Sequence, residues 1–119
     1  GYEGPYDIVT CAYCLECNFT SGEAISKAIG RISKLVKSGG YFVLTVSSIL
    51  DPPEPPYVFE QTAIAGFKYR SFWCAPVQSY IDAFRANGYT VVNHVVHPYP
   101  HPTLDSDDIY AIIVGKKVN

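Results

Sequence analysis

The sequence contains no methionine, a single tryptophan and no long hydrophobic run. No apolar stretch approaches the roughly 20 residues needed to cross a bilayer, and the amino terminus does not have the pattern of a signal peptide. Basic residues are scattered along the sequence, and the net charge is −2. This balance excludes the clustered positive charge typical of proteins that bind nucleic acid or an anionic membrane surface. These absences predict a cytoplasmic protein.

The lack of methionine includes the first position, because the chain starts at Gly1. A strand pattern follows almost at once, so we expect a truncated product rather than a processed one. What is present suffices for one packed domain. The chain has 119 residues, 48% of them hydrophobic, and ten are tyrosines. No second domain is predicted.

Three of the four cysteines, Cys11, Cys14 and Cys17, have C-x2-C-x2-C spacing. The spacing overlaps the start of a bacterial iron–sulfur motif, but the fourth cysteine and the proline of that motif are missing. Cys11 and Cys14 also lie an odd number of residues apart beside a strand, which puts them on opposite faces. The same argument separates His94 from His97. Buried free thiols are therefore favoured over a cluster, and no metal site is predicted.

The apolar patterns predict a parallel β-α-β unit, then a hairpin, a second helix and two more strands. Residues Tyr6–Ala12 are almost continuously apolar, as expected of a strand covered on both faces. Thr20 and Glu23 have the spacing of a capping box. The helix that they open would present apolar residues on one face up to Val36, and Gly39-Gly40 would end it. The later predicted elements are a strand at Tyr41–Val46, hairpin strands at Tyr57–Thr62 and Lys68–Trp73, a helix from Pro76 to Gly88, and strands at Tyr89–Val96 and Ile109–Val114.

This order of elements resembles the C-terminal half of the small-molecule amine methyltransferases: the phenylethanolamine, nicotinamide and indolethylamine (thioether) N-methyltransferases. Four segments carry the resemblance, namely Ala12-Tyr13-Cys14-Leu15-Glu16, Lys37-Ser38-Gly39-Gly40, Tyr57 and Asp107-Asp108. The resemblance covers essentially the whole chain. It implies an α/β fold, the Rossmann-like fold of class I S-adenosylmethionine-dependent methyltransferases. Residues 1–119 would form the C-terminal half only, strands four to seven with an inserted β-hairpin.

The resemblance also implies a strand order of four, five, seven and six. Tyr6–Ala12 would then lie at an edge of the sheet, where the chain could self-associate. The glycine-rich loop that holds the cofactor in this fold is absent from the sequence. S-adenosylmethionine is the implied cofactor, and by resemblance Ala12, Tyr13 and Cys14 would line it.

Four further residues are implied to face the substrate, together with Tyr13. Glu16 matches a family carboxylate near the substrate amine, and Glu54 stands where one branch of the family has a second. Tyr57 matches the tyrosine that closes over methyl donor and acceptor, and Asp107 matches an acidic substrate contact. A cationic amine needs carboxylates to hold it and one of them to accept a proton before nitrogen attacks. Glu16 and Glu54 are therefore the predicted catalytic residues.

The leading hypothesis is a fragment of an N-methyltransferase for small amines, inactive as the isolated chain. Val46 stands near the position where the nicotinamide branch of the family has a substrate-facing aspartate. This difference disfavours nicotinamide as the acceptor. Another small nucleophile, such as a heteroaromatic nitrogen or sulfur, is an alternative acceptor. The alternative from another class is a stand-alone, non-catalytic module of the same origin that binds a protein partner or itself. On that hypothesis Glu16 caps a loop, the tyrosines pack, and Asp107 is a solvated turn residue.

Overall fold

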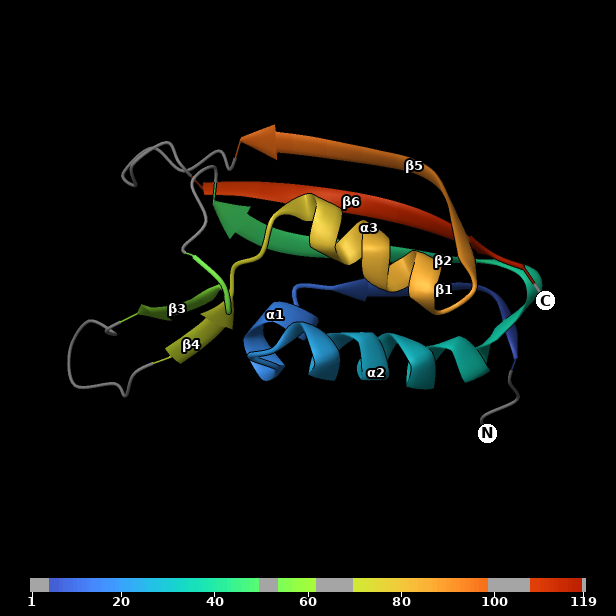
Figure 1. Cartoon of the computed structure of the whole chain (residues 1–119). Helices are drawn as coiled ribbons and strands as arrows, with labels where there is room; N and C mark the ends of the chain where they lie inside the picture. The colour runs from blue at the N-terminus through green and yellow to red at the C-terminus, as the bar shows by residue number, and fades with distance from the viewer. Residues whose placement is uncertain (1–4, 50–53, 62–69, 99–107, 119) are drawn as a thin grey trace.

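The first described strand, β1 (Tyr6–Ala12), pairs in parallel with β2 (Val36–Ile49). Parallel neighbours need a crossover connection, and α2 (Gly22–Ile32) supplies it here. The computed structural model describes residues 5–49, 54–61, 70–98 and 108–118. Figure 1 shows the chain leaving β1, passing along α2 and returning into β2. The predicted β-α-β unit is confirmed.

Four strands form one mixed sheet in the order β1-β2-β6-β5. Strand β6 (Asp108–Lys117) lies antiparallel to β2 on one side and to β5 (Tyr89–Pro98) on the other. This is the order that the resemblance implies for strands four, five, seven and six, and the prediction is confirmed. Within the described residues β1 and β5 are the edges of this sheet, so the edge position expected for Tyr6–Ala12 is confirmed as well.

Helix α2 begins one residue later than the sequence predicts. Ser21, and not Thr20, is the N-cap, and its Oγ accepts a hydrogen bond of 3.1 Å from the backbone N–H three residues on. The predicted capping box of Thr20 with Glu23 is therefore wrong. Packing between distant segments explains the shift, because Gly22 then becomes the first helical residue. A Cβ at Gly22 would lie 3.1 Å from the ring of Trp73, so a residue without a side chain suits this position.

The end of this helix also differs from the prediction. Helix α2 stops at Ile32, and a 3₁₀ turn (Ser33–Leu35) leads into β2. Gly39 and Gly40 lie inside β2, so they do not end the helix. A Cβ at Gly40 would lie 2.8 Å from the backbone oxygen of Asp7 in β1. Glycine is needed here because β1 and β2 approach closely.

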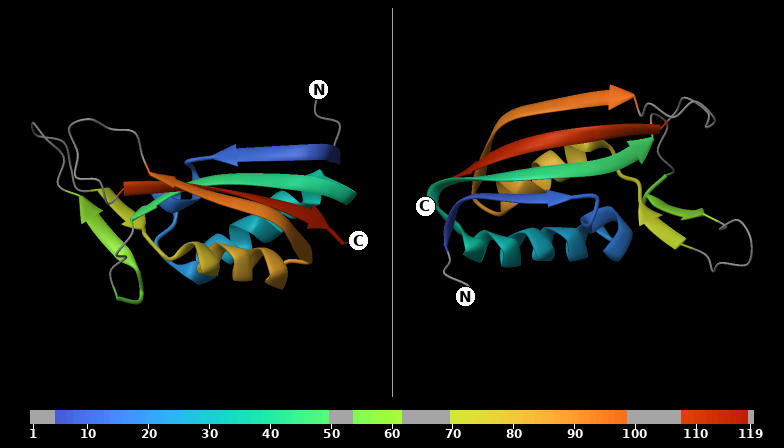
Figure 2. Two further views of the ribbon diagram at one scale, coloured as in Figure 1. Left: turned by 90° about the horizontal axis from the view of Figure 1, so that it is seen from above. Right: turned by 180° about the vertical axis from the view of Figure 1, so that it is seen from behind.

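Helix α3 (Val77–Ala86) follows its predicted boundaries, with Pro76 as the N-cap and Gly88 beyond its end at φ +83°. Helices α2 and α3 pack side by side on the same face of the sheet (Figures 1 and 2). The core lies between them and the strands. Its largest fully buried side chains are Tyr80, Phe42, Phe84, Ile25, Ile29, Leu44, Ile113, Val36 and Val46.

The other side of the sheet carries no helix in the part of the chain that the structure describes (Figure 2, right). We call this surface the open face. It consists of every second residue along each strand, namely the residues whose side chains lie on the side of the sheet away from α2 and α3. These are Ile8, Thr10 and Ala12 of β1, Tyr41, Val43, Thr45 and Ser47 of β2, Tyr110, Ile112, Val114 and Lys116 of β6, and Thr90, Asn93, Val95 and His97 of β5.

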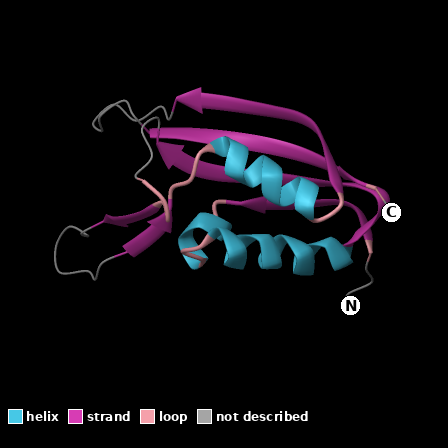
Figure 3. Ribbon diagram, viewed as in Figure 1, coloured by secondary structure: helices cyan, strands magenta, loops and turns pink. Residues whose placement is uncertain are grey.

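Strands β3 (Val58–Gln61) and β4 (Arg70–Trp73) pair antiparallel in a separate two-stranded sheet. The predicted hairpin is confirmed for these residues, and 62–69 lie outside the described chain. Figure 3 shows the hairpin projecting beyond one end of the four-stranded sheet. A short helix, α1 (Leu15–Asn18), lies where the sequence pattern predicts only a turn. None of the helices in the described segments is long and apolar enough to cross a membrane.

Candidate functional site

The parallel strands β1 and β2 end at the same edge of the sheet, beside the β3–β4 hairpin (Figure 1). Helix α1 follows β1 directly and lies against β4. In open α/β sheets ligands bind outside the carboxyl ends of the strands. This edge is therefore where a functional site is expected, and most of the predicted site residues fall on it.

Tyr13 follows the last residue of β1 and has a left-handed backbone, with φ +56°. Its N–H donates to the Thr45 carbonyl of β2 at 2.9 Å, which holds the turn against the sheet. A positive φ is rare for a bulky aromatic residue and costs of order 1–3 kcal/mol. The side chain is 41% exposed. Tyr13 thus combines a strained backbone with an accessible ring at the carboxyl end of a strand, a combination that clusters at ligand sites.

The other two predicted cofactor residues flank Tyr13. Ala12 ends β1, and the Cys14 thiol donates to the Ala12 carbonyl at 3.3 Å. Asn18 secures the same turn from α1, because its side-chain Nδ2 donates to the Cys14 carbonyl at 2.6 Å. The structure therefore brings Ala12, Tyr13 and Cys14 together in one braced turn. Asn18 is a positioning residue that the sequence pattern does not reveal.

Tyr57 is the second residue with a left-handed backbone, at φ +64°. Its N–H donates to the Glu54 carbonyl at 3.0 Å, and its own carbonyl accepts from the Cys74 N–H at 2.7 Å. The ring is half-buried and meets Trp73 edge-on, with centroids 6.4 Å apart. Two backbone hydrogen bonds and one aromatic contact thus hold Tyr57 in a left-handed backbone conformation that glycine adopts more readily than tyrosine.

The three predicted acidic residues differ in what the structure describes. Glu54 is exposed and stands in the turn that leads to Tyr57. Glu16 lies in α1, although its side chain is not among those described. Asp107 lies outside the described residues. Glu16 and Glu54 thus stand on two different segments, α1 and the turn before the hairpin, and their substrate roles stay predictions.

Trp73 holds several segments of this region together. The sequence pattern predicts only that it lies in a hairpin strand. Its ring packs on Tyr80 of α3 at 4.9 Å between centroids, on Tyr57, and against the start of α2 at Gly22. Three segments distant in sequence thus converge on one side chain. Its status as the single tryptophan was the signal available in the sequence.

The cysteines occupy three environments. Cys11 is half-buried on the helix side of β1, Cys14 is exposed and Cys74 is buried, and none of these three described cysteines forms a disulfide bond. The expectation of burial is therefore wrong for Cys14, because the strand ends at Ala12 and the turn carries Cys14 out of the sheet. Within the described residues, no three histidine, cysteine, aspartate or glutamate side chains gather as metal ligands would.

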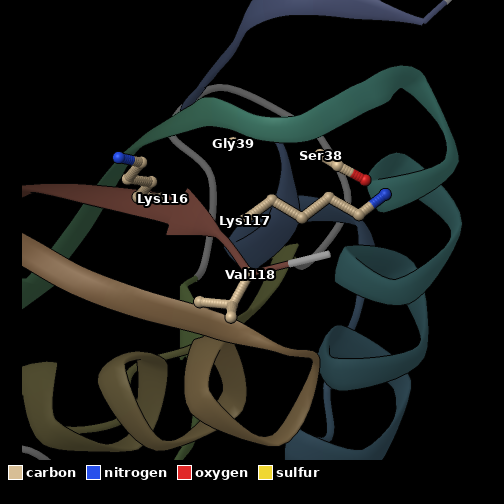
Figure 4. Close-up of a pocket in the computed structure, with 5 residues that line it drawn as sticks. All are labelled: Ser38, Gly39, Lys116, Lys117 and Val118. Atoms are coloured by element: carbon tan, nitrogen blue, oxygen red, sulfur yellow. The ribbon is translucent and has the colours of Figure 1, made fainter.

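A shallow depression lies at the opposite end of the sheet and is lined by Ser38, Gly39, Lys116, Lys117 and Val118. Figure 4 shows the two lysines pointing in different directions. The Lys117 ammonium donates to backbone carbonyls of Ser33 and Val36, at 2.7 and 2.9 Å. The lining groups do not converge on a common point, and one of them already closes the end of a helix. This depression is structural.

Comparison with known proteins places the fold. No protein-family model matches the sequence, and no curated protein matches it. Among solved structures, an S-adenosylmethionine-dependent methyltransferase of Methanosarcina mazei has a TM-score of 0.77 at 11% identity, over 98% of this chain and 61% of its own. This chain has part of a class I methyltransferase fold.

Two other solved structures define how far this similarity extends. The 1,6-didemethyltoxoflavin-N1-methyltransferase of Burkholderia thailandensis, solved with 1,6-didemethyltoxoflavin and S-adenosylhomocysteine, has a TM-score of 0.67 at 18% identity. That match covers all of this chain and 47% of the other. The [4+2]-cyclase SpnF has a TM-score of 0.64 at 14% identity, over 98% of this chain and 53% of its own. The chain thus spans 47–61% of the length of these three structures, and one fold hosts more than one chemistry.

Proposed function

We propose that this chain is the substrate-side part of an S-adenosylmethionine-dependent methyltransferase that acts on a small amine. The observation that carries the proposal is the braced, left-handed turn at Tyr13. It stands at the carboxyl end of β1, in a fold whose matched structures include one with bound S-adenosylhomocysteine. The choice of an N-methyltransferase rests on the sequence resemblance.

In this proposal the turn and the tyrosine rings position the reactants. Methyl transfer from a sulfonium is an in-line displacement, so the enzyme chiefly aligns donor and acceptor and excludes water. Ala12 and Cys14 line the cofactor, and the exposed ring of Tyr13 packs against both cofactor and substrate. Tyr57, held by its two backbone bonds, covers them from the hairpin side. S-adenosylmethionine supplies the methyl group when bound.

The carboxylates handle the charge of the amine. Glu16 and Glu54 attract the protonated amine, and one of them accepts its proton so that the nitrogen lone pair is free to attack. Asp107 supplies a further contact. An aromatic wall at Tyr13 also favours a cation, through the negative face of its ring. This set of residue types is the argument for a cationic amine over a neutral acceptor.

The cofactor itself requires more protein than the described sheet provides. Both α2 and α3 cover one face, and the open face and the outer edge of β1 have no partner in the described residues. In this fold the cofactor binds where the order of strands reverses. We place that point at the outer edge of β1, beside Ala12 and Tyr13. A glycine-rich unit pairing with β1 there would complete the site, and we expect the isolated chain to bind the cofactor poorly.

Titration calorimetry with S-adenosylhomocysteine tests the proposal. The 119-residue chain is compared with the native polypeptide purified from its source, whose intact mass is recorded. We expect no binding by the chain alone, and a Kd on the order of micromolar for a native polypeptide larger than 13.1 kDa. Micromolar binding by the chain alone would contradict the need for a second unit. A native polypeptide of 13.1 kDa would contradict the fragment.

The amine requires its own comparison in the native polypeptide. Replacement Glu16→Gln keeps the size of the side chain and removes its charge. We expect kcat/KM to fall about tenfold to a hundredfold for a cationic amine and much less for a neutral acceptor of the same shape. An equal loss for both acceptors would point to a structural role of Glu16 and would remove the charge argument.

A non-catalytic module is the second candidate, and one observation favours it. Ile8, on the edge strand β1, is an apolar residue that is 61% exposed. Such an edge pairs readily with a strand of another protein. A native polypeptide of 13.1 kDa that does not bind S-adenosylhomocysteine would favour this candidate over the enzyme.

A further inference from the structure

The side chain of Ser48 is a buried hydroxyl near the carboxyl end of β2. Among the described residues, Ser33 and Ser48 are the buried ones with a short polar side chain. Ser33 bonds to the Tyr89 hydroxyl, far from the candidate site, whereas Ser48 is 4% exposed and lies one residue before the end of the strand. A hydroxyl that leaves water costs free energy unless it is hydrogen-bonded. The partner of Ser48 therefore indicates what the residue does.

That partner lies between the hairpin and α3. The Ser48 Oγ donates to the Ala75 carbonyl at 3.0 Å, and Ala75 is fully buried. Ala75 is the last of three residues, 73–75, that we call the connecting segment. They lead from the end of β4 toward α3, and all three are buried. The hydrogen bond from Ser48 thus joins this segment to the central strand β2.

The connecting segment in turn holds Tyr57. The Cys74 N–H donates to the Tyr57 carbonyl at 2.7 Å, and the Trp73 ring meets the Tyr57 ring edge-on. Trp73 is itself joined to α3, because its carbonyl accepts from the Tyr80 hydroxyl at 3.4 Å. The Glu54 carbonyl, which bonds the Tyr57 N–H, belongs to the same turn as Tyr57 and does not fix that turn relative to the sheet.

We propose that Ser48 is a positioning residue for Tyr57, which it reaches through its hydrogen bond to Ala75 and the neighbouring Cys74. The inference rests on the proposed function, in which Tyr57 covers the methyl donor and acceptor. A ring that aligns reactants must be held by supporting hydrogen bonds, and a left-handed backbone persists only where the surrounding structure enforces it. Loss of the Ser48 hydroxyl frees the connecting segment, and Tyr57 shifts with it.

Kinetics of the native polypeptide tests the proposal, and the adjacent serine supplies the control. For Ser48→Ala we expect kcat/KM for the amine to fall about tenfold, while the Kd for S-adenosylhomocysteine stays within about twofold. The cofactor is spared because the residues proposed to line it follow β1 and not β4. Ser47→Ala makes the same change at a half-buried residue on the open face, and it is expected to leave both values unchanged.

A double-mutant cycle separates this role from a general loss of stability. If Ser48 acts through Tyr57, then Ser48→Ala costs nothing further in a Tyr57→Ala background, and the two effects on kcat/KM are not additive. Effects that multiply independently would give Ser48 a merely structural role and overturn the proposal. Circular dichroism confirms that each variant is folded. Ser48→Cys, which offers only a weak S–H donor, replaces Ser48→Ala if that variant does not fold, with a smaller expected loss.

Amide hydrogen exchange, resolved by NMR, gives a readout that does not depend on activity. In the native polypeptide, Ser48→Ala is expected to speed exchange of the Cys74 and Tyr57 N–H groups, whereas Ser47→Ala is not. Faster exchange at both amides in a polypeptide that transfers no methyl group would remove the proposed function and support the link between Ser48 and Tyr57. Unchanged exchange at both amides would overturn that link, whatever the activity.

Discussion

The two ends of the four-stranded sheet differ in how their backbone groups and side chains are held. At the amino end of β2, Lys117 donates to the Ser33 and Val36 carbonyls, and the buried Ser33 hydroxyl bonds to the Tyr89 hydroxyl at 2.9 Å. At the carboxyl end, Tyr13 and Tyr57 keep left-handed backbones. At the amino end of β2, buried polar groups are thus hydrogen-bonded. At the carboxyl end, two residues have a strained backbone.

The amino end of the sheet contributes to stability, whereas the carboxyl end carries the proposed site. The Tyr89 ring is 3% exposed and packs edge-on against Phe84 at 5.2 Å. Burial raises the pKa of its hydroxyl, and the hydrogen bond from Ser33 offsets part of that rise. None of the described side chains at this end converges on a common point, as ligand-binding groups would. The packing and hydrogen bonds at the amino end stabilise the fold, and this stability offsets the cost of the left-handed backbone at the proposed site.

The largest expected effect is at the amino end. Tyr89→Ala removes a buried ring and leaves a cavity beside Phe84, so the free energy of unfolding is expected to fall by about 3–5 kcal/mol. Urea denaturation followed by circular dichroism measures it. Thr90→Ala changes the next residue, which is exposed, and should stay within about 0.5 kcal/mol of the native chain. Similar losses for both would show that the buried Tyr89 ring contributes no more to stability than an exposed side chain beside it.

A smaller effect is expected from the lysine that closes the helix. Lys117→Met keeps the length of the side chain and removes the donor to two carbonyls, which should cost about 1–3 kcal/mol. Lys116→Met is the control, because Lys116 is exposed and faces the Tyr41 ring at 6.0 Å. Denaturation midpoints compare the two. Equal effects would mean that the carbonyl contacts of Lys117 contribute nothing.

The smallest expected effect on stability is at the carboxyl end of the sheet, and here one of two replacements is expected to be the more stable. Tyr13→Gly relieves the left-handed backbone, whereas Tyr13→Ala removes the ring and keeps the strain. We expect the glycine variant to be about 1 kcal/mol more stable than the alanine variant. Both should weaken S-adenosylhomocysteine binding in the native polypeptide. Equal stability of the two variants would remove the evidence for strain at the proposed site.

The order of strands was predictable because short apolar runs separated by Gly and Pro are local signals, and the resemblance fixed how they are arranged. Helix α3 was equally clear, between Pro76 and Gly88. The N-cap was not, because Thr20 and Ser21 are both good caps and only the packing of Trp73 on Gly22 decides between them. The end of the helix was misjudged because both glycines lie inside β2, where Gly40 permits the close approach of β1.

The candidate site was predictable only in part. The resemblance named Tyr13 and Tyr57, and both have left-handed backbones. It could not name Asn18, whose role depends on the carbonyl that its side chain reaches across a helical turn. Glu16, Glu54 and Asp107 stay predictions as substrate contacts, because a carboxylate in a sequence carries no information about what lies opposite it.

Local pattern by itself determined the elements of this protein, since apolar spacing, proline and glycine act within a few residues. Contacts between distant segments decided the rest. They selected Ser21 as the cap and closed the amino end of β2 around Lys117. Such contacts join residues far apart in the chain, and their energies depend on shape and burial that exist only after the strands have paired.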